Sequence, residues 1–367
     1  MFNGRETVLA LDLGSSSLKA VELEALGGKA VVRRAACVDM PVPPDGDREN
    51  RPDRRARLIE ALGDLLRGLG VKPGKARRVV SGLPAAQVSI KQIRCPALPD
   101  SEIRSALAFE ARKHLPVEGE ILVDFQVLAR RPDELDVLLV AAAKRAVSDH
   151  LAMLEACGVK GGIIEAPSLA LWNAFLDLEA PPADGEAWGL LQIGAATASL
   201  SFFRSAGLFF TREIAIAGDR FTEDARERHG GDFAAAERAK VAQGLFGAQE
   251  EAGGGGSGLG LELEEESRGR NPSLQDLVRE VQRSIRFYLK ESGRPRIEGL
   301  LLAGGSAAGP GLEEYLAKEI GVPARRFDPL ARLEGGAAAR VANRPQFAQA
   351  VGMAMRGMHE FFPHRFK

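Results

Sequence analysis

The sequence predicts an α/β protein with two lobes of similar design and a small α+β unit inserted after the start of the first. A strand, a glycine-containing turn and two more strands open the chain, and the same order recurs after residue 186. Between these runs, residues 85–160 show the order strand, helix, strand, strand, helix. The 367 residues are 45% hydrophobic, which excludes wholesale disorder and allows two or three domains.

Residues 1–84 and 161–183 form the predicted first lobe. Residues 54–69 carry apolar side chains at helical spacing, and Gly70 is a stop signal. Residues 168–175 predict a second helix, whereas residues 41–53, rich in Pro, Asp and Arg, predict a loop. The predicted strands are residues 7–13, 18–24, 30–38, 78–82 and 163–165.

The predicted inserted unit, residues 85–160, contains three strands and two helices. The first helix begins at Asp100 or Ser101, either of which can cap it, and ends near His114. The second covers residues 148–157, with Ser148 as its cap. We expect both helices to cover one face of a small sheet. Its strands are residues 88–94, 122–130 and 135–143.

The predicted second lobe follows a linker at residues 181–185. Residues 186–218 and 297–360 form its core, and residues 219–296 form a helical subdomain. Within the subdomain, residues 247–270 combine four successive glycines with an acidic run, so we expect a disordered loop there. The predicted strands are residues 187–193, 197–203, 207–214 and 299–303. The predicted helices are residues 219–229, 233–245, 271–292, 313–320 and 345–360.

Charge and cysteine content narrow the classes of function. With 49 basic and 50 acidic residues, the formal net charge is −1, so no global field attracts nucleic acid or an anionic membrane. The three cysteines are scattered without metal-ligand spacing, which fits a reduced compartment. We see neither a secretory signal nor a run long enough to span a bilayer. We therefore expect a cytoplasmic protein without nucleic-acid partners, whose association with a membrane is indirect.

The first glycine turn has the composition of a phosphate site. Gly14 removes the Cβ that would block close approach of a ligand to the backbone, and successive N–H groups in such a turn can hold an anion. Asp12 can hold a metal ion through water. An ordinary hairpin turn, with Asp and Ser bonded to their own backbone, is the alternative. The candidate residues are Asp12, Gly14, Ser15, Ser16, Ser17 and Lys19.

Two later turns extend the pattern. Gln192 ends a strand and is followed by Gly194, Ala195 and Thr197, again a glycine turn with a hydroxyl. A buried strand then ends in Gly304, Gly305 and Ser306, where paired glycines allow a flat ligand to lie against the backbone. Neither a Walker A loop nor a Gly-x-Gly-x-x-Gly fingerprint occurs. Three such turns together indicate a nucleotide site more specifically than any one alone.

These turns resemble the phosphate 1, phosphate 2 and adenosine motifs of the actin-like ATPase superfamily. The resemblance implies an actin-like two-lobed α/β fold that binds ATP or ADP with Mg²⁺, the ion being held by Asp12. Glu237 and Lys240 share one helix face and fit the helix that contacts ribose and base in such proteins, with a surface ion pair as the alternative. The small residues of 348–357 resemble the closing interdomain helix, with plain close helix packing as the alternative.

Within the superfamily, the chain resembles PilM, a family of type IV pilus assembly proteins. The resemblance is carried by three segments that are similar to sequence motifs of the family, residues 12–23, 109–116 and 350–357. In addition, residues 85–160 lie where PilM and FtsA have an extra subdomain. The resemblance implies a scaffold that binds the cytoplasmic N-terminal peptide of the inner-membrane protein PilN and, through PilN, joins PilO in a ring-like complex. Pilus motor ATPases and a homo-oligomeric ring are further candidate partners.

One position departs from the superfamily pattern. The second motif normally opens with aspartate, where this chain has Gln192, and an amide can neither act as a general base nor neutralise Mg²⁺. Asp12 and Gln192 are the candidate catalytic positions, and we expect ATP binding to survive better than hydrolysis. Glu213 and Asp219 are carboxylates that could compensate. A small-molecule kinase and an FtsA- or GspL-like assembly protein are the alternatives. The aromatic, basic residues 361–367 are expected to pack against the protein or to form a frayed end rather than to bind membrane.

Overall fold

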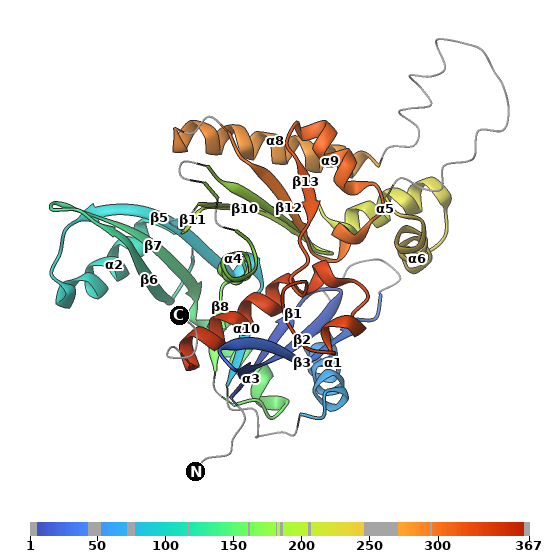
Figure 1. Ribbon diagram of the computed structural model, residues 1–367, viewed down its shortest axis with the longest axis horizontal. Helices are drawn as coiled ribbons and strands as arrows, with labels where there is room; N and C mark the ends of the chain where they lie inside the picture. The colour runs from blue at the N-terminus through green and yellow to red at the C-terminus, as the bar shows by residue number, and fades with distance from the viewer. Residues whose placement is uncertain are drawn as a thin grey trace, which may run out of the picture.

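Figure 1 shows the computed structural model, in which two five-stranded sheets and a smaller third sheet carry the helices. The predicted loop at residues 247–270 and the tail beyond residue 362 lie outside the described residues, as does most of the predicted loop at 41–53. The structure describes residues 6–42, 53–71, 78–115, 117–160, 162–180, 182–183, 186–204, 207–245, 271–293 and 296–362.

The first lobe is built on a mixed sheet of order β3-β2-β1-β4-β8. Its first three strands form an antiparallel meander, and β4 and β8 then add in parallel to β1. Helix α1 (Arg54–Gly68) packs its buried leucines under this sheet. The strands are β1 (Thr7–Leu13), β2 (Ser17–Leu26), β3 (Lys29–Asp39), β4 (Val79–Gly82) and β8 (Ile163–Glu165).

The second lobe repeats this design with the order β11-β10-β9-β12-β13. Again three antiparallel strands are followed by two that add in parallel, so β9 corresponds to β1 and β12 to β4. The predicted duplication of strand, glycine turn and strand is therefore seen at the level of whole sheets. The strands are β9 (Trp188–Ile193), β10 (Ala198–Arg204), β11 (Gly207–Ile214), β12 (Gly299–Ala303) and β13 (Ala324–Arg326).

Helices cover the outer part of the second lobe, and Figure 1 shows α8 and α9 beside β12 and β13. Helix α8 is strongly amphipathic, and its buried leucines and valines share one hydrophobic cluster with β9, β10 and β12. Asn271 caps α8 by accepting a hydrogen bond from the backbone N–H of Leu274. The helices are α5 (Gly218–His229), α6 (Phe233–Gln243), α8 (Pro272–Ser292) and α9 (Leu312–Ile320).

The third sheet, of order β5-β7-β6, projects to the left in Figure 1. Its strands are β5 (Val88–Pro96), β6 (Ile121–Arg130) and β7 (Glu134–Ala143), and a 3-10 turn, Ala85–Gln87, precedes them. Helix α2 (Asp100–His114) shares its hydrophobic cluster. Helix α3 (Lys144–Ala156) does not, because its buried Met153 and Leu154 belong to the first-lobe cluster beneath α1. The expectation that both helices cover the small sheet was therefore wrong for α3.

Both predicted helix caps in this region were wrong. Pro99 precedes α2, and Asp100 is already its first residue, so neither Asp100 nor Ser101 is the cap. Helix α3 begins four residues before Ser148, directly after β7 ends at Ala143. The alanines at the end of β7 are compatible with a strand or a helix. No capping side chain therefore marks the point where the strand ends and the helix begins.

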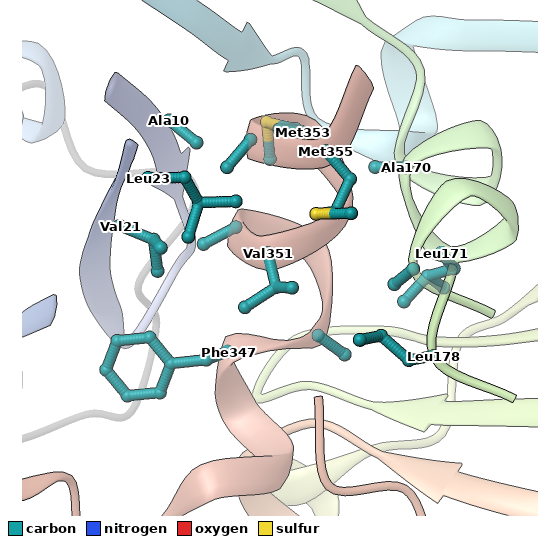
Figure 2. Close-up of a cluster of buried hydrophobic side chains, with 14 of the residues drawn as sticks. Ala10, Val21, Leu23, Ala170, Leu171, Leu178, Phe347, Val351, Met353 and Met355 are labelled. Atoms are coloured by element: carbon teal, nitrogen blue, oxygen red, sulfur yellow. The ribbon is translucent and has the colours of Figure 1, made fainter. Parts of the chain in front are cut away.

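Helices α4 (Pro167–Leu178) and α10 (Ala348–Phe361) lie between the two lobes. The predicted last helix began at Pro345, but residues Arg344–Phe347 form a 3-10 turn before α10, as residues Ala338–Arg340 do further upstream. Figure 2 shows α10 side chains such as Val351 and Met355 between the strands carrying Ala10 and Leu23 and the helix carrying Leu171. Their cluster also contains Leu190 and Leu301 of the second lobe, so one core joins both sheets.

A glycine permits the close crossing of α10 and α4. A Cβ placed on Gly352 would lie 1.7 Å from the backbone oxygen of Ala170 in α4, so a larger residue would have to push the helices apart. The small residues expected in this helix are thus required for close packing. Among the described residues, no helix combines the length and the apolar character needed to cross a membrane.

Candidate functional site

A cavity of about 790 Å³ opens where the glycine turns of the two lobes face each other. All the residues assigned from the sequence to the three glycine turns and to the helix face at 237–240 line it, and so does Glu213, whereas Asp219 does not. The chain segments concerned are far apart in sequence and meet only through the duplicated topology. They are Asp12, Gly14, Ser15, Ser16, Ser17, Lys19, Gln192, Gly194, Ala195, Thr197, Glu237, Lys240, Gly304, Gly305 and Ser306.

The first turn joins β1 to β2 and places a carboxylate beside an ammonium group. Asp12 and Lys19 are opposite each other in the two strands, and Lys19 Nζ lies 3.6 Å from Asp12 Oδ2. Both side chains are largely buried. Burial raises the pKa of Asp12, and the neighbouring Lys19 acts against that rise. A Cβ on Gly14 would lie 2.7 Å from the backbone oxygen of Ser17, so this tight turn requires glycine.

The second turn joins β9 to β10 and is tied to the start of α5. The Gly194 N–H donates to the Thr197 carbonyl over 3.1 Å, and the Gly194 carbonyl accepts from Gly218 N over 3.0 Å. The Gln192 Oε1 atom is buried and has no hydrogen-bond partner within the described residues. A buried acceptor left without a donor costs free energy, so a bound ligand or water is expected to satisfy it.

The third turn follows β12 and brings backbone to the cavity wall. Gly304 has φ of +91°, and a Cβ there would lie 2.3 Å from the Ile193 carbonyl oxygen, so only glycine fits. Gly305 faces open space. Its carbonyl accepts a hydrogen bond from Asn343 Nδ2 over 3.1 Å, and Asn343 also lines the cavity. Sequence reasoning missed Asn343, for which the only signal was its place shortly before a proline.

Helix α6 contributes an ion pair that is not on the outer surface. Lys240 Nζ lies 2.8 Å from Glu237 Oε2 and donates to Gly218 O over 2.9 Å and to Thr222 Oγ1 over 2.7 Å. The Lys240 side chain is only 9% exposed, which argues against the alternative of a solvated surface pair. The three N–H donors of the Lys240 ammonium group thus have three acceptors. These contacts join α6 to α5 and hold Glu237 at the cavity.

The residues present fit a nucleotide with its divalent cation. Glycines stand where any Cβ would obstruct the backbone, two hydroxyl-bearing turns face each other, and Asp12 supplies a carboxylate. Among the described residues, no group of three His, Cys, Asp or Glu side chains could by itself hold a metal ion. Mg²⁺ commonly binds through one or two carboxylates, water and the phosphates of its ligand, so a dense protein cage is not required.

Comparison with known proteins identifies a family and the fold. A family model described as type IV pilus assembly protein PilM matches residues 10–358. A solved PilM–PilN type IV pilus biogenesis complex has a chain 24% identical to this one, with 95% of this chain and 98% of that chain covered and a TM-score of 0.76. The ethanolamine utilization protein EutJ from Carboxydothermus hydrogenoformans is 12% identical, with 95% and 89% covered and a TM-score of 0.54. The fold is thus the actin-like two-lobed α/β fold.

Proposed function

The chain belongs to the PilM family of type IV pilus assembly proteins, and on this premise we propose that it is a cytoplasmic ATP-binding scaffold of the pilus assembly complex. It associates with the inner membrane through its partner PilN and meets PilO through PilN. One observation carries the nucleotide part of the proposal. All three glycine turns, from three separate parts of the chain, line a single cavity with Asp12 and Lys19 on its wall.

Each turn has a distinct role in the proposed site. The turn at Gly14 and the turn at Gly194 hold the phosphates from opposite lobes through backbone N–H groups and hydroxyls. The backbone at Gly304 and Gly305 supports the flat base, and Glu237, held by Lys240, accepts from the ribose hydroxyls. Asp12 holds Mg²⁺, which neutralises phosphate charge when bound.

The same residues favour binding over rapid turnover. Gln192 provides an amide where a carboxylate would serve as base, and an amide does not accept a proton from water at neutral pH. A small-molecule kinase needs such a base and a polar substrate cleft, so Gln192 and the family membership both weigh against that alternative. In this proposal the nucleotide acts as a ligand that holds the two lobes together rather than as a substrate that is rapidly hydrolysed.

The PilN peptide is the partner that the proposal names first. The similar solved structure is a PilM–PilN complex. A second cavity, of about 250 Å³, is lined by residues of β5 and β11, which are edge strands of their sheets. An extended peptide can bind such an edge through main-chain hydrogen bonds and place alternate side chains in pockets. We place the peptide at this edge, beside Ser89 and Thr211.

A titration tests both parts of the proposal. Purified protein is titrated with ATP, with and without Mg²⁺, and separately with a synthetic peptide from the N-terminus of PilN. Saturable binding of both, with little ADP release, is expected. A Ser89→Arg variant should lose peptide affinity and keep ATP affinity. Failure to bind either ligand contradicts the corresponding part of the proposal, and rapid ADP release that depends on a small-molecule substrate would favour the kinase.

A further inference from the structure

A row of three side chains crosses the second-lobe sheet where it borders the nucleotide cavity. Ser199 of β10 is opposite Gln192 of β9 on one side and opposite Glu213 of β11 on the other. Side chains at directly opposed positions of antiparallel strands project from the same face. All three residues line the cavity, so Glu213 faces the same space as Gln192.

The first lobe has the equivalent row, and its charges are arranged differently. Asp12 of β1, Lys19 of β2 and Cys37 of β3 are opposed in the same order. In this row the carboxylate of Asp12 is on β1, and the ammonium group of Lys19 is next to it on β2. In the second lobe, β9 carries the amide of Gln192, β10 the hydroxyl of Ser199 and β11 the carboxylate of Glu213. Each of the two rows therefore still presents one carboxylate to the cavity.

The surroundings of Glu213 leave its negative charge uncompensated. No ion pair joins it to a Lys, Arg or His side chain within the part of the chain that the structure describes. It is hydrogen-bonded to Thr197, a residue of the second glycine turn. The side chain is open to the cavity, yet enough protein surrounds it for desolvation to raise its pKa to about 7. A carboxylate in this setting attracts a cation brought by a ligand.

Asp219, the other carboxylate that could stand in for the missing aspartate, is placed differently. It lies in the first turn of α5, where a negative charge is favoured by the helix dipole, and it does not line the cavity. Its backbone N–H donates to the Ala195 carbonyl over 2.8 Å, so its main chain supports the turn. Of the two, only Glu213 faces the space where phosphates would lie.

We propose that Glu213 holds, through a coordinated water, the divalent cation that accompanies a nucleoside triphosphate in this cavity. The inference rests on the proposed nucleotide binding. Two strand spacings separate β11 from β9, about 10 Å in total, so a direct bond to an ion beside Gln192 is out of reach. Mg²⁺ usually keeps several of its waters, and a water-mediated contact is the form that this spacing permits.

The test measures how much Mg²⁺ tightens ATP binding, by calorimetric titration with and without the ion. Glu213→Gln keeps the shape of the side chain and removes its charge. We expect it to reduce the Mg²⁺-dependent gain in affinity about tenfold. Without Mg²⁺, ATP should bind at least as tightly as to the wild type, because a negative charge that faces the phosphates has been removed. Asp219→Asn, which removes a charge outside the cavity, is the matched control and should leave the gain unchanged. In the double variant Gln192→Asp/Glu213→Gln, the gain should return.

The outcomes separate this inference from the proposed function. A wild type that binds no ATP contradicts both. A wild type that binds ATP with a Mg²⁺-dependent gain, together with a Glu213→Gln variant that keeps the full gain, overturns the inference alone. Unfolding temperatures of the variants are compared first. If Glu213→Gln does not fold, Glu213→Asp, which keeps the charge but shortens its reach, is measured in its place against the same two outcomes.

Discussion

At the scale of single residues, Asp12 is the group of the first lobe that we propose holds the cation. It is buried, its carboxylate faces Lys19 and it borders the cavity. Asp12→Asn should weaken binding of Mg·ATP about tenfold or more, because a ligand of the cation is lost while the shape stays the same. Asp64→Asn, an exposed change on α1, is the control. Equal Mg·ATP affinity for wild type and Asp12→Asn would remove Asp12 from the site.

The adjacent glycines 304 and 305 allow a matched test of backbone geometry. Gly304→Ala puts a Cβ against the Ile193 carbonyl in a positive-φ conformation, so it should cost about 1–3 kcal/mol of unfolding free energy and weaken ATP binding. Gly305→Ala meets open space and should leave stability nearly unchanged. Chemical denaturation of both variants measures the difference. Similar stabilities would mean that the turn is not held as described.

Two residues of the site show where the sequence stops being informative. The turns at Gly14, Gly194 and Gly304 were recognisable because glycine after a strand is a local pattern. Asn343 and the place of Glu213 were not, since neither belongs to a motif. Asn343 reaches the cavity through a hydrogen bond to the Gly305 carbonyl, and Glu213 faces it through the register of β11 on β10. Contacts of this kind depend on register, which a single sequence does not display.

At the scale of elements, the crossing of α10 and α4 is the most demanding contact in the core. Gly352→Ala would overlap the Ala170 carbonyl, so we expect it to cost about 1–3 kcal/mol or more. Gly68→Ala, at the end of α1 with open space around it, should be neutral or slightly stabilising. Thermal unfolding compares the two. A Gly352→Ala protein as stable as the wild type would contradict the close crossing.

The pair of Ser81 in β4 and His150 in α3 makes stability depend on pH. Ser81 Oγ lies 2.9 Å from His150 Nε2, and burial lowers the pKa of His150 to about 4. The unfolded chain, with an ordinary histidine pKa near 6.5, therefore binds more protons between about pH 4 and 6.5. This residue's contribution to stability is present above pH 6.5 and is lost as the pH falls, by about 3 kcal/mol at pH 4.

The measurement compares wild type with His150→Gln. Unfolding free energies are determined between pH 7 and pH 4.5, and the difference between the two proteins is followed, so that other titrating groups cancel. The difference should shift in favour of the variant as the pH falls. A difference that stays constant with pH would contradict the buried, neutral state of His150.

Most helices and strands were predictable because amphipathic periods and glycine stops are local. The errors were one short strand that was not predicted and several element boundaries, and none of these has a local signal. β13 is three residues long and partly exposed, and it exists because it pairs with β12. The start of α3 follows a strand without a turn residue, and Pro345 opens a 3-10 turn instead of a helix. In each case tertiary pairing or packing decided the outcome.

At the scale of the whole molecule, duplication explains both the fold and the site. Each lobe ends its first strand in a glycine turn, and the common core around α4 and α10 sets the two turns against one cavity. In the proposed function, the amide of Gln192 favours nucleotide binding over turnover.

The most direct test of this account is a crystal structure of the protein with Mg²⁺ and a non-hydrolysable ATP analogue. We predict the triphosphate between the turns at Gly14 and Gly194, the adenine against Gly304 and Gly305, and the cation next to the phosphates, within reach of Asp12 and, through a water, of Glu213. A nucleotide bound elsewhere, or a cavity that stays empty at saturating analogue, would contradict it.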